Sequence, residues 1–503
     1  MEITGRIKQI IDERIKKIDS LRKEGINPYS HKFEGDRDHS LDIKNEYSSL
    51  REEEYGGEVR VAGRVMTKRG MGKISFIGLQ DLRGNIQVVF QKGVTPEDAL
   101  SLFKKVDTGD IIGLSGKVFK TRRGEISVMA ENLAILTKAI LPLPDKFHGI
   151  KDEDERLRKR YLDIIMNEDV KDIFVKKRMY HKAMRDFLER KGFLEVETPV
   201  LENSAGGAAA TPFATHHNAL DLDVYLRISV GELWQKKLLV AGYEKTFEIG
   251  RIFRNEGMDA EHLQDYTSME FYWGYADYRM GMELVEEMYK EVANSVLEKL
   301  DFEVNGHHVD LGIEWKEYDY EKTIEEKTGI NIYSTSKEDI MKFLDSKKID
   351  YDEAVDKWRM VDLLWKFCRR QITGPGFLTG QPVEIAPLAK RKEEDSRKVE
   401  QFQVIMAGSE VGNGYSELND PIDQEERFKK QRELKEGGDS EAMDHDKGFV
   451  EALRYGMPPA CGFGVSERFF GFLMGRPLRE CVAFPLMRPE FEVEKNEKDS
   501  NKS

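Results

Sequence analysis

The sequence of 503 residues contains few cysteines and no long apolar run. Its three cysteines, Cys368, Cys461 and Cys481, share no Cys-x-x-Cys spacing, which argues against a disulfide framework and against a zinc site. Because no stretch of about 18 apolar residues occurs, we expect neither a membrane-spanning helix nor a secretory signal. These absences favour a protein of a reducing compartment, and a cytoplasmic location is expected.

The common nucleotide-binding and hydrolase signatures are also missing. The chain has no G-x-x-x-x-G-K-[ST] phosphate loop, no strand–G-x-G-x-x-G–helix unit and no G-x-S-x-G serine motif. Its net charge of −14 argues against non-specific coating of nucleic acid. The charge is uneven, however, since residues 58–125 carry 13 lysines and arginines against 7 aspartates and glutamates. This pattern suggests that one domain meets a polyanion while another domain has a different task.

Two domains are predicted from the change of pattern along the chain. Residues 1–145 begin with an amphipathic helix over residues 5–24 and continue with five short β-rich runs between glycine-bearing turns. Five short strands in about 80 residues favour an OB-fold, a small barrel that binds single-stranded nucleic acid. Residues 155–490 mix helices and strands without regular alternation, which indicates an α+β domain. The polar residues 491–503 are expected to form a disordered tail.

The expected strands of the second domain include residues 245–254, 266–275 and 382–388. The first two are predicted to form a long hairpin. One face of this hairpin would carry Arg254, Glu256, Ser268, Glu270 and Tyr272. An ordinary solvated sheet face is the plain alternative. However, an arginine, two glutamates and a tyrosine opposite an apolar face suit the floor of a binding site.

Two further segments of this domain could carry chemistry. In an extended segment, the side chains of Asn413, Tyr415 and Glu417 would line up on one side. Together with Glu270 and Glu232 they would supply several carboxylates for a cation or a metal ion. The segment PPACGFGVSERFFGFLMG places Arg468 after several glycines at the expected start of a helix, where an arginine suits an anion. Taken separately, each of these segments is as easily read as ordinary solvated structure.

Taken together, the segments are similar to the signature motifs of class II aminoacyl-tRNA synthetases, and most closely to those of the lysyl-tRNA synthetases. The matching pieces follow one another in family order over residues 5–489, and they include PFATHHNALDLDVYLRIS, FRNEGMDAEHLQDYTSMEFY and EVGNGYSELND. Residues 170–192 and the following GFLEVETPVL resemble motif 1, which builds the dimer interface in this family. The resemblance implies a homodimer, with an antiparallel-sheet catalytic domain behind an OB-fold anticodon-binding domain.

The resemblance also implies a reaction and a set of residues. The reaction is the ATP-dependent ligation of L-lysine to tRNA(Lys) through lysyl-adenylate, which releases AMP and pyrophosphate. The implied catalytic residues are Arg254 and Arg468. The implied ATP-binding residues are Arg254, Glu256, His262, Tyr266, Glu410 and Arg468. The implied lysine-binding residues are Gly206, Gly207, Glu232, Arg254, Glu270, Tyr272, Asn413 and Glu417. Anticodon bases would contact Phe76, Gln87 and Glu125, and Mg²⁺ would be bound by Glu410 and Gln403.

Physical chemistry is consistent with several of these implied roles. A positioned guanidinium such as that of Arg254 stabilises the charge that develops when the α-phosphate of ATP is attacked. Glu410 offers the oxygen ligand that Mg²⁺ prefers. Gln403, by contrast, stands where this family usually has a second metal-binding glutamate. A neutral amide is a weaker magnesium ligand than a carboxylate, so the number of bound ions stays open.

Two alternatives stay open at the level of sequence. The first is a related ligase for aspartate or asparagine. A buried acidic pocket that includes Glu270 and Glu417 argues against it, because such a pocket would repel an aspartate side chain. The second is a catalytically idle RNA-binding paralogue. Such a protein would be expected to lose Arg254, Glu410 or Arg468, and all three are present.

Overall fold

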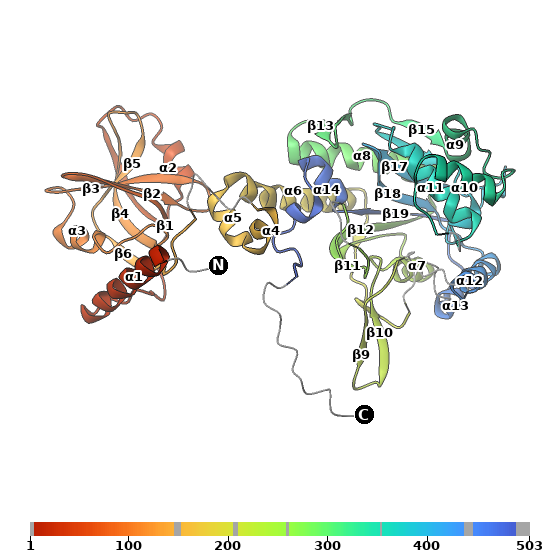
Figure 1. The fold of residues 1–503 in the computed structure, drawn as a ribbon, viewed down its shortest axis with the longest axis horizontal. Coiled ribbons are helices and arrows are strands. Elements are labelled where there is room, and N and C mark those ends of the chain that lie inside the picture. Colours follow the sequence, from red (N-terminus) through yellow and green to blue (C-terminus); the bar gives the residue numbers. More distant parts are fainter. Residues whose placement is uncertain are drawn as a thin grey trace. The chain divides into compact units, whose positions relative to one another are not determined.

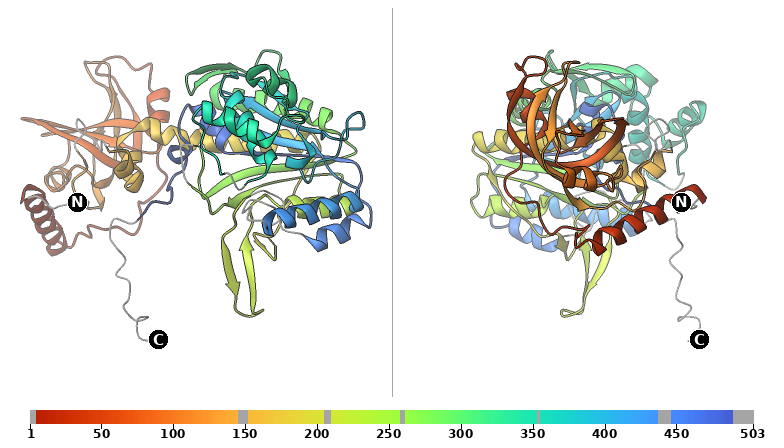
Figure 2. Two further views of the ribbon diagram at one scale, coloured as in Figure 1. Left: turned by 45° about the vertical axis from the view of Figure 1, so that its right-hand side comes forward. Right: turned by 90° about the vertical axis from the view of Figure 1, so that its left-hand side faces the viewer.

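The structure of the chain is a computed structural model, which describes residues 5–144, 152–204, 210–257, 261–352, 355–436 and 446–488. The chain divides into two compact units, Met1–Asp152 and Glu153–Ser503 (Figures 1 and 2). The predicted tail, residues 491–503, lies outside the described residues. Over the described ranges, no helix combines the length and the apolar character that crossing a membrane requires.

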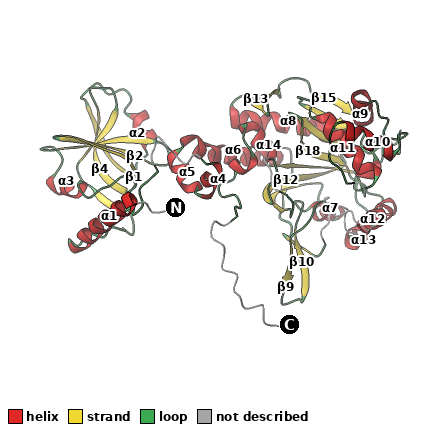
Figure 3. Cartoon of the chain, viewed as in Figure 1, coloured by secondary structure: helices red, strands yellow, loops and turns green. Residues whose placement is uncertain are grey.

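The first unit is a closed β-barrel preceded by a helix (Figure 3). Its strands are β1 (Tyr55–Met71), β2 (Ile74–Gln80), β3 (Asn85–Gln91), β4 (Ile111–Lys120), β5 (Ile126–Ala130) and β6 (Ala134–Thr137). Its helices are α1 (Gly5–Lys23), α2 (Ser40–Glu46) and α3 (Glu97–Phe103). The strands are hydrogen-bonded in the order β1-β2-β3-β5-β4-β6, and an additional pairing of β1 with β4 closes the barrel.

The long strand β1 makes this closure possible by pairing on both sides. Its residue Arg64 lies opposite both Gln80 on β2 and Ile111 on β4. At the neighbouring Gly63, a Cβ atom would lie only 2.3 Å from the carbonyl oxygen of Gln80. Only glycine allows this close approach of the two backbones. The result is a small barrel of the OB-fold type, as the β-rich runs predicted.

Helix α1, which the sequence also predicted, is fixed to the barrel by a buried arginine. The guanidinium of Arg14 donates hydrogen bonds of 2.9 Å to each of the carbonyl oxygens of Thr108, Ala139 and Leu141. Buried charged groups are tolerated when such partners satisfy them. The helix is therefore an integral part of the first unit.

The second unit is built around an eight-stranded sheet with the order β15-β16-β17-β18-β19-β12-β11-β7. Its pairings are antiparallel except for β7 with β11 and β15 with β16. The strands of this sheet are β7 (Leu194–Glu195), β11 (Lys245–Phe253), β12 (Asp265–Gly274), β15 (Lys316–Asp319), β16 (Gly376–Thr379), β17 (Gln401–Met406), β18 (Ser409–Ser416) and β19 (Ala460–Ser466). Smaller sheets contain β8 (Leu201–Glu202), β9 (Ala214–His217), β10 (Leu222–Leu226), β13 (Asp301–Val304) and β14 (His307–Asp310).

Helices cover this sheet on both faces (Figures 1 and 2). The helices described in this unit are α4 (Glu153–Arg158), α5 (Arg160–Met166), α6 (Glu168–Arg190), α7 (Glu232–Val240), α8 (Tyr278–Leu297), α9 (Tyr320–Thr328), α10 (Lys337–Ser346), α11 (Lys357–Arg369), α12 (Pro421–Glu436), α13 (Lys447–Leu453) and α14 (Arg468–Met474). Two short 3₁₀ helices are η1 (Val383–Ile385) and η2 (Leu478–Cys481). The unit is thus of the predicted α+β class.

The two faces of the sheet have different character. On one face, α6, α8 and α14 pack against apolar side chains of the strands, among them Met269 and Phe271 of β12 and Phe463 of β19. The other face, next to α7, carries the polar residues Glu270 and Tyr272 of the same strand β12. Because side chains alternate along a strand, one strand serves the core and the site at once. This alternation was predicted from the sequence and is confirmed.

Two local predictions were wrong. The predicted hairpin exists as the antiparallel pair β11–β12, but β11 ends at Phe253. Arg254 and Glu256 therefore follow the strand instead of sharing one of its faces. Residues 382–388 were predicted as a strand, yet they contain the 3₁₀ helix η1. Pro382 and Pro387 of this segment lack the backbone N–H that a strand ladder needs.

Candidate active site

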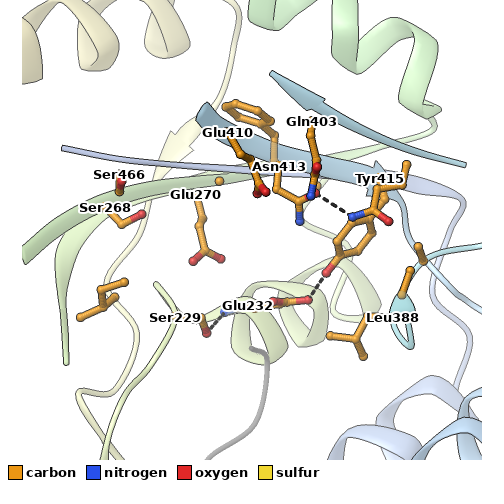
Figure 4. A pocket seen from close by; sticks show the side chains of 18 of the residues that line it. Ser229, Glu232, Ser268, Glu270, Leu388, Gln403, Glu410, Asn413, Tyr415 and Ser466 are labelled. Carbon is orange, nitrogen blue, oxygen red and sulfur yellow. Dashed lines mark hydrogen bonds between the residues drawn. The ribbon is translucent and has the colours of Figure 1, made fainter. Parts of the chain in front are cut away.

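A cavity of about 390 Å³ lies on the polar face of the large sheet (Figure 4). Its lining comes from β11, β12, β17, β18 and β19, from the first residues of α7 and α14, and from residues 385–389. The predicted site residues in this lining are Glu232, Arg254, Tyr266, Glu270, Tyr272, Gln403, Glu410, Asn413, Glu417 and Arg468. Most of the residues predicted to bind ATP and lysine therefore surround one cavity, although they come from distant parts of the sequence.

Two glycines on the central strand β19 leave room for this cavity. Gly462 lies between Tyr272 and Tyr415 of the neighbouring strands, and Gly464 is paired with Glu270 of β12. A Cβ atom added to Gly462 would lie 2.1 Å from Oε1 of Glu417. A Cβ atom added to Gly464 would lie 3.2 Å from Cγ of Glu270. The space that these glycines leave is occupied by the acidic side chains of the site.

Three glutamates form an acidic group in the cavity. Glu232, Glu270 and Glu417 are only 6%, 9% and 1% exposed. The hydroxyl of Tyr272 donates a hydrogen bond of 3.0 Å to Glu270. The hydroxyl of Tyr415 donates another to Glu232, which projects toward it from α7 (Figure 4). Both phenols act as neutral donors to carboxylates, since burial raises the pKa of each well above its ordinary value.

Burial also changes the protonation of two of these carboxyl groups, those of Glu270 and Glu417. Desolvation, together with the nearby charge of Glu232, raises the pKa of Glu270 to about 7. Desolvation likewise raises the pKa of Glu417 to about 8, although the ammonium group of Lys236 opposes the shift. Carboxylates that are buried together in this way repel each other and favour a cationic guest. The acidic group therefore suits a ligand that carries ammonium groups.

Sequence reasoning missed Lys236, which lies on α7 behind the acidic group. Its Nζ atom is 2.8 Å from Oε1 of Glu232 and 2.6 Å from Oε2 of Glu417. The only sequence signal was the spacing of four residues from Glu232, which on a helix is also typical of a solvent-exposed ion pair. The contact with Glu417 depends on the tertiary fold and has no local signature.

Two arginines in the cavity lining can meet anionic groups. The Nε atom of Arg254 donates a hydrogen bond of 3.3 Å to the carbonyl oxygen of Ile228. Arg468 begins α14, as predicted, and one of its Nη atoms donates a bond of 2.8 Å to the backbone carbonyl of Glu410. Its other Nη atom lies 2.5 Å from Nε2 of His262. These contacts aim two guanidinium groups at the cavity that also holds the acidic group.

Arg468 is supported from the opposite face of the sheet. The preceding residue, Glu467, is buried and forms an ion pair of 2.9 Å with Lys177 on α6. On the same helix, the hydroxyl of Tyr180 donates a hydrogen bond of 3.3 Å to the backbone carbonyl of Ser466. The long helix α6 thus holds the junction between β19 and α14 from which Arg468 extends.

The structure also places the two predicted metal ligands in one lining. Glu410 and Gln403 come from the neighbouring strands β18 and β17, and Figure 4 shows both. Within the described residues, the buried Oε1 atom of Gln403 accepts no hydrogen bond. The carboxylate of Glu410 lies 3.6 Å from Arg369. One carboxylate and one unsatisfied amide oxygen fit a hard cation whose other ligands are mostly water molecules and phosphate oxygens.

Four other residues were predicted to bind ATP or lysine, namely Gly206, Gly207, Glu256 and His262. Gly206 and Gly207 lie outside the described residues. Glu256 is exposed and accepts a hydrogen bond of 3.2 Å from the backbone N–H of Thr211. Neither Glu256 nor His262 is part of the cavity lining, although His262 contacts Arg468 there.

The predicted anticodon residues lie in the barrel of the first unit. Phe76 on β2 is half-buried, and the barrel core contains its neighbour Ile77 instead. Gln87 on β3 lies opposite Gly78 of β2, and its amide donates a hydrogen bond of 2.9 Å to the hydroxyl of Ser127. Glu125 is exposed just before β5. An aromatic side chain outside the barrel core is available for stacking on a base.

Comparison with known families gives two matches. Residues 152–488 match the family described as tRNA synthetases class II (D, K and N). Residues 59–136 match the family described as OB-fold nucleic acid binding domain. The OB-fold match lies within the first structural unit, and the synthetase match covers the second unit from its start and begins one residue before it, at Asp152. The two matches confirm the predicted fold class.

Near full-length relatives were also found. A lysine–tRNA ligase of Enterococcus faecalis is 41% identical over 483 residues, which cover 94% of this chain and 96% of the relative. One of Carboxydothermus hydrogenoformans is 42% identical over 489 residues, covering 96% and 99%. One of Bacillus subtilis is 42% identical over 480 residues, covering 94% and 96%. On this evidence, the chain belongs to the class II aminoacyl-tRNA synthetases, in the lysine–tRNA ligase family.

Proposed function

We propose that the chain activates L-lysine with ATP and transfers the lysyl group to tRNA(Lys). The observation that carries this proposal is a single cavity lined by three buried glutamates and by two arginines. The glutamates suit the ammonium groups of lysine, while the arginines suit its carboxylate and the phosphates of ATP. A substrate with an acidic side chain would be repelled by the same glutamates.

In the proposed lysine site, each polar group of the substrate has a partner. Glu232, together with Gly206 and Gly207, receives the α-ammonium group. Asn413, held by a hydrogen bond of 2.8 Å from Gln401, receives the carboxylate. The residues proposed for the side-chain ammonium are Glu417 and Tyr272, supported by Glu270. Their low exposure keeps water out and so strengthens these interactions.

In the proposed ATP site, positively charged groups bind the phosphates. Arg254 would lie against the α-phosphate, and Arg468 would bind the adenine or the γ-phosphate. Tyr266 would stack on the base, with Glu256 and His262 beside the nucleotide. Glu410 and Gln403 would hold Mg²⁺, which supplies further positive charge to the phosphates when it is bound.

The proposed reaction has two steps. First, a carboxylate oxygen of lysine attacks the α-phosphorus of ATP, and the bond to the leaving pyrophosphate breaks. Arg254 stabilises the negative charge of this transition state without transferring a proton. Second, a hydroxyl of the 3′-terminal adenosine of the tRNA attacks the lysyl carbonyl, forming the ester and releasing AMP. Phe76, Gln87 and Glu125 would contact the anticodon.

Lysine-dependent ATP–pyrophosphate exchange tests the first step. The purified chain is assayed with Mg²⁺ and without tRNA, with lysine, aspartate and asparagine side by side. Exchange with lysine alone is expected. Exchange with aspartate or asparagine would contradict the proposed pocket, and silence with all three would contradict the proposed activity.

We further propose that the protein acts as a homodimer in the cytoplasm, with α6 in the subunit interface. Sedimentation analysis of the purified chain tests the assembly. The expected mass is twice the 58.1 kDa of one chain, and a monomer at micromolar concentration would contradict it.

A further inference from the structure

The ammonium group of Lys236 is fully enclosed beside the acidic group. Its side chain is 2% exposed and does not line the cavity. Besides Glu232 and Glu417, it is surrounded by aromatic rings. Its Nζ atom lies 5.9, 5.4 and 5.6 Å from the ring centres of Tyr272, Tyr415 and Phe449, respectively. The two carboxylates raise the pKa of Lys236 against the effect of burial, so that it stays charged.

Lys236 offsets part of the negative charge of the acidic group. The acidic group contributes three carboxylates, from Glu232, Glu270 and Glu417. Across the described ranges, Lys236 is the only lysine or arginine that forms an ion pair with any of them. Arg254 acts on Glu270 only as a more distant charge. When all three glutamates are ionised, two negative charges therefore remain without a cation.

We propose that Lys236 is a specificity-determining positioning residue, whose buried ammonium group balances one of the three carboxylates so that the cavity fits a guest with two ammonium groups. The α-ammonium and the side-chain ammonium of lysine supply the two missing charges. This inference rests on the proposed function. It adds that a residue outside the cavity lining decides how many cationic groups the cavity accepts.

The position of Lys236 between two carboxylates explains why it is needed. Without it, Glu232 and Glu417 would face each other in a buried site with no resident cation. Such a pair lowers its energy by taking up a proton, as closely spaced carboxylates do. A protonated carboxyl group no longer attracts an ammonium group. Lys236 thus opposes proton uptake by Glu417 and holds both carboxylates in place for the substrate.

The pH dependence of lysine binding follows from the same groups. Those that face Glu417 are Glu232 and Lys236 on α7, Glu270 and Tyr272 on β12, Tyr415 on β18, and Cys461 on β19. Ammonium groups bind the ionised carboxylates, and the raised pKa values of Glu270 and Glu417 are about 7 and 8. Binding therefore releases protons in this range, and the KM for lysine should fall as the pH rises through it.

The variant Lys236→Met tests the inference, with pyrophosphate exchange measured from pH 6 to pH 9. Methionine keeps the length of the side chain and removes its charge. We expect the KM for lysine at neutral pH to rise about a hundredfold or more, because one partner of a buried ion pair is removed. We also expect the pH at which KM falls to move upward by about one unit or more, since Lys236 no longer lowers the pKa of Glu417.

Lys237→Met is the matched control. The Nζ atom of Lys237 lies 4.4 Å from the ring centre of Trp234. Its substitution should leave both the KM for lysine and the pH at which KM falls unchanged.

A double variant separates charge balance from a structural role. In the background Glu270→Gln, one carboxylate is already neutral, so that the loss of Lys236 leaves the same two negative charges. There, Lys236→Met should raise KM less than about tenfold relative to Glu270→Gln alone. An equal increase in both backgrounds, or an unchanged pH profile, would overturn the inference. Wild-type protein without lysine-dependent exchange would instead overturn the proposed function.

Discussion

Replacing Gly462 by alanine tests how tightly the floor of the cavity is shaped. Gly462 lies on β19, and an added Cβ atom would come within 2.1 Å of Oε1 of Glu417 and 2.7 Å of Cε1 of Tyr272. Ordinary contact between carbon atoms is about 3.5–4.0 Å. The new methyl group must therefore displace the carboxylate and the phenol that we propose to bind the side-chain ammonium group of lysine.

The size of the effect follows from the interaction that is lost. A hydrogen bond to a charged group contributes about 1.5–3 kcal/mol. Its loss corresponds to an increase of about 10- to 150-fold in the KM for lysine. The fold should survive, because one extra methyl group in a packed site typically costs about 1–3 kcal/mol. The KM for ATP should change little, since the displaced side chains belong to the acidic group.

The assay is pyrophosphate exchange at varied lysine, with thermal unfolding measured on the same samples. Gly464→Ala is the matched control on the same strand. Its Cβ atom would lie 3.2 Å from Cγ of Glu270, a contact that a small shift relieves. We expect a smaller increase in KM for this variant. A folded Gly462→Ala protein with wild-type KM for lysine would refute the reasoning, as would a larger effect at Gly464.

Three further predictions concern other parts of the proposed machinery. Arg254→Lys should lower kcat of exchange by about a hundredfold, because an ammonium group cannot reproduce the planar fork of a guanidinium; a rate near wild type would contradict the proposed role. Phe76→Ala should raise the KM for tRNA in aminoacylation by about 5- to 150-fold, the equivalent of one base stack, and leave pyrophosphate exchange unchanged. Gln403→Glu should shift the Mg²⁺ titration of exchange to lower concentration, because a carboxylate is the better ligand beside Glu410; an unchanged titration would place the ion elsewhere.

The parts of this site that follow a local rule could be predicted from the sequence. The alternation along β12 placed Glu270 and Tyr272 on the polar face, because the period of a strand is two residues. Arg468 was correctly placed at the start of a helix. The end of β11 was misjudged, because the apolar residues before Arg254 give no sign of where pairing stops. Strand ends depend on the partner strand and on the turn.

The parts that depend on tertiary contacts could not be predicted. Lys236 and Glu417 lie 181 positions apart in the sequence, and only the fold brings their charges within 2.6 Å. On a helix taken alone, a lysine four residues after a glutamate is typical of an exposed pair. The position of residues 385–389 in the cavity lining could not be predicted for a similar reason. An apolar segment that contains two prolines resembles an edge strand, but in the structure it forms only isolated bridges, such as that of Pro382 with Lys398.

The support of Arg468 from α6 has a consequence for mutational tolerance. The ion pair of Lys177 with Glu467 and the hydrogen bond of Tyr180 to Ser466 join this helix to the segment that carries the arginine. Substitutions on the inward stripe of α6 should therefore lower activity although they touch no substrate. Substitutions on its outward stripe should leave the catalysis of a single subunit intact. A systematic mutational scan of α6 would then show sensitive positions repeating with helical periodicity, far in sequence from the motif that they support.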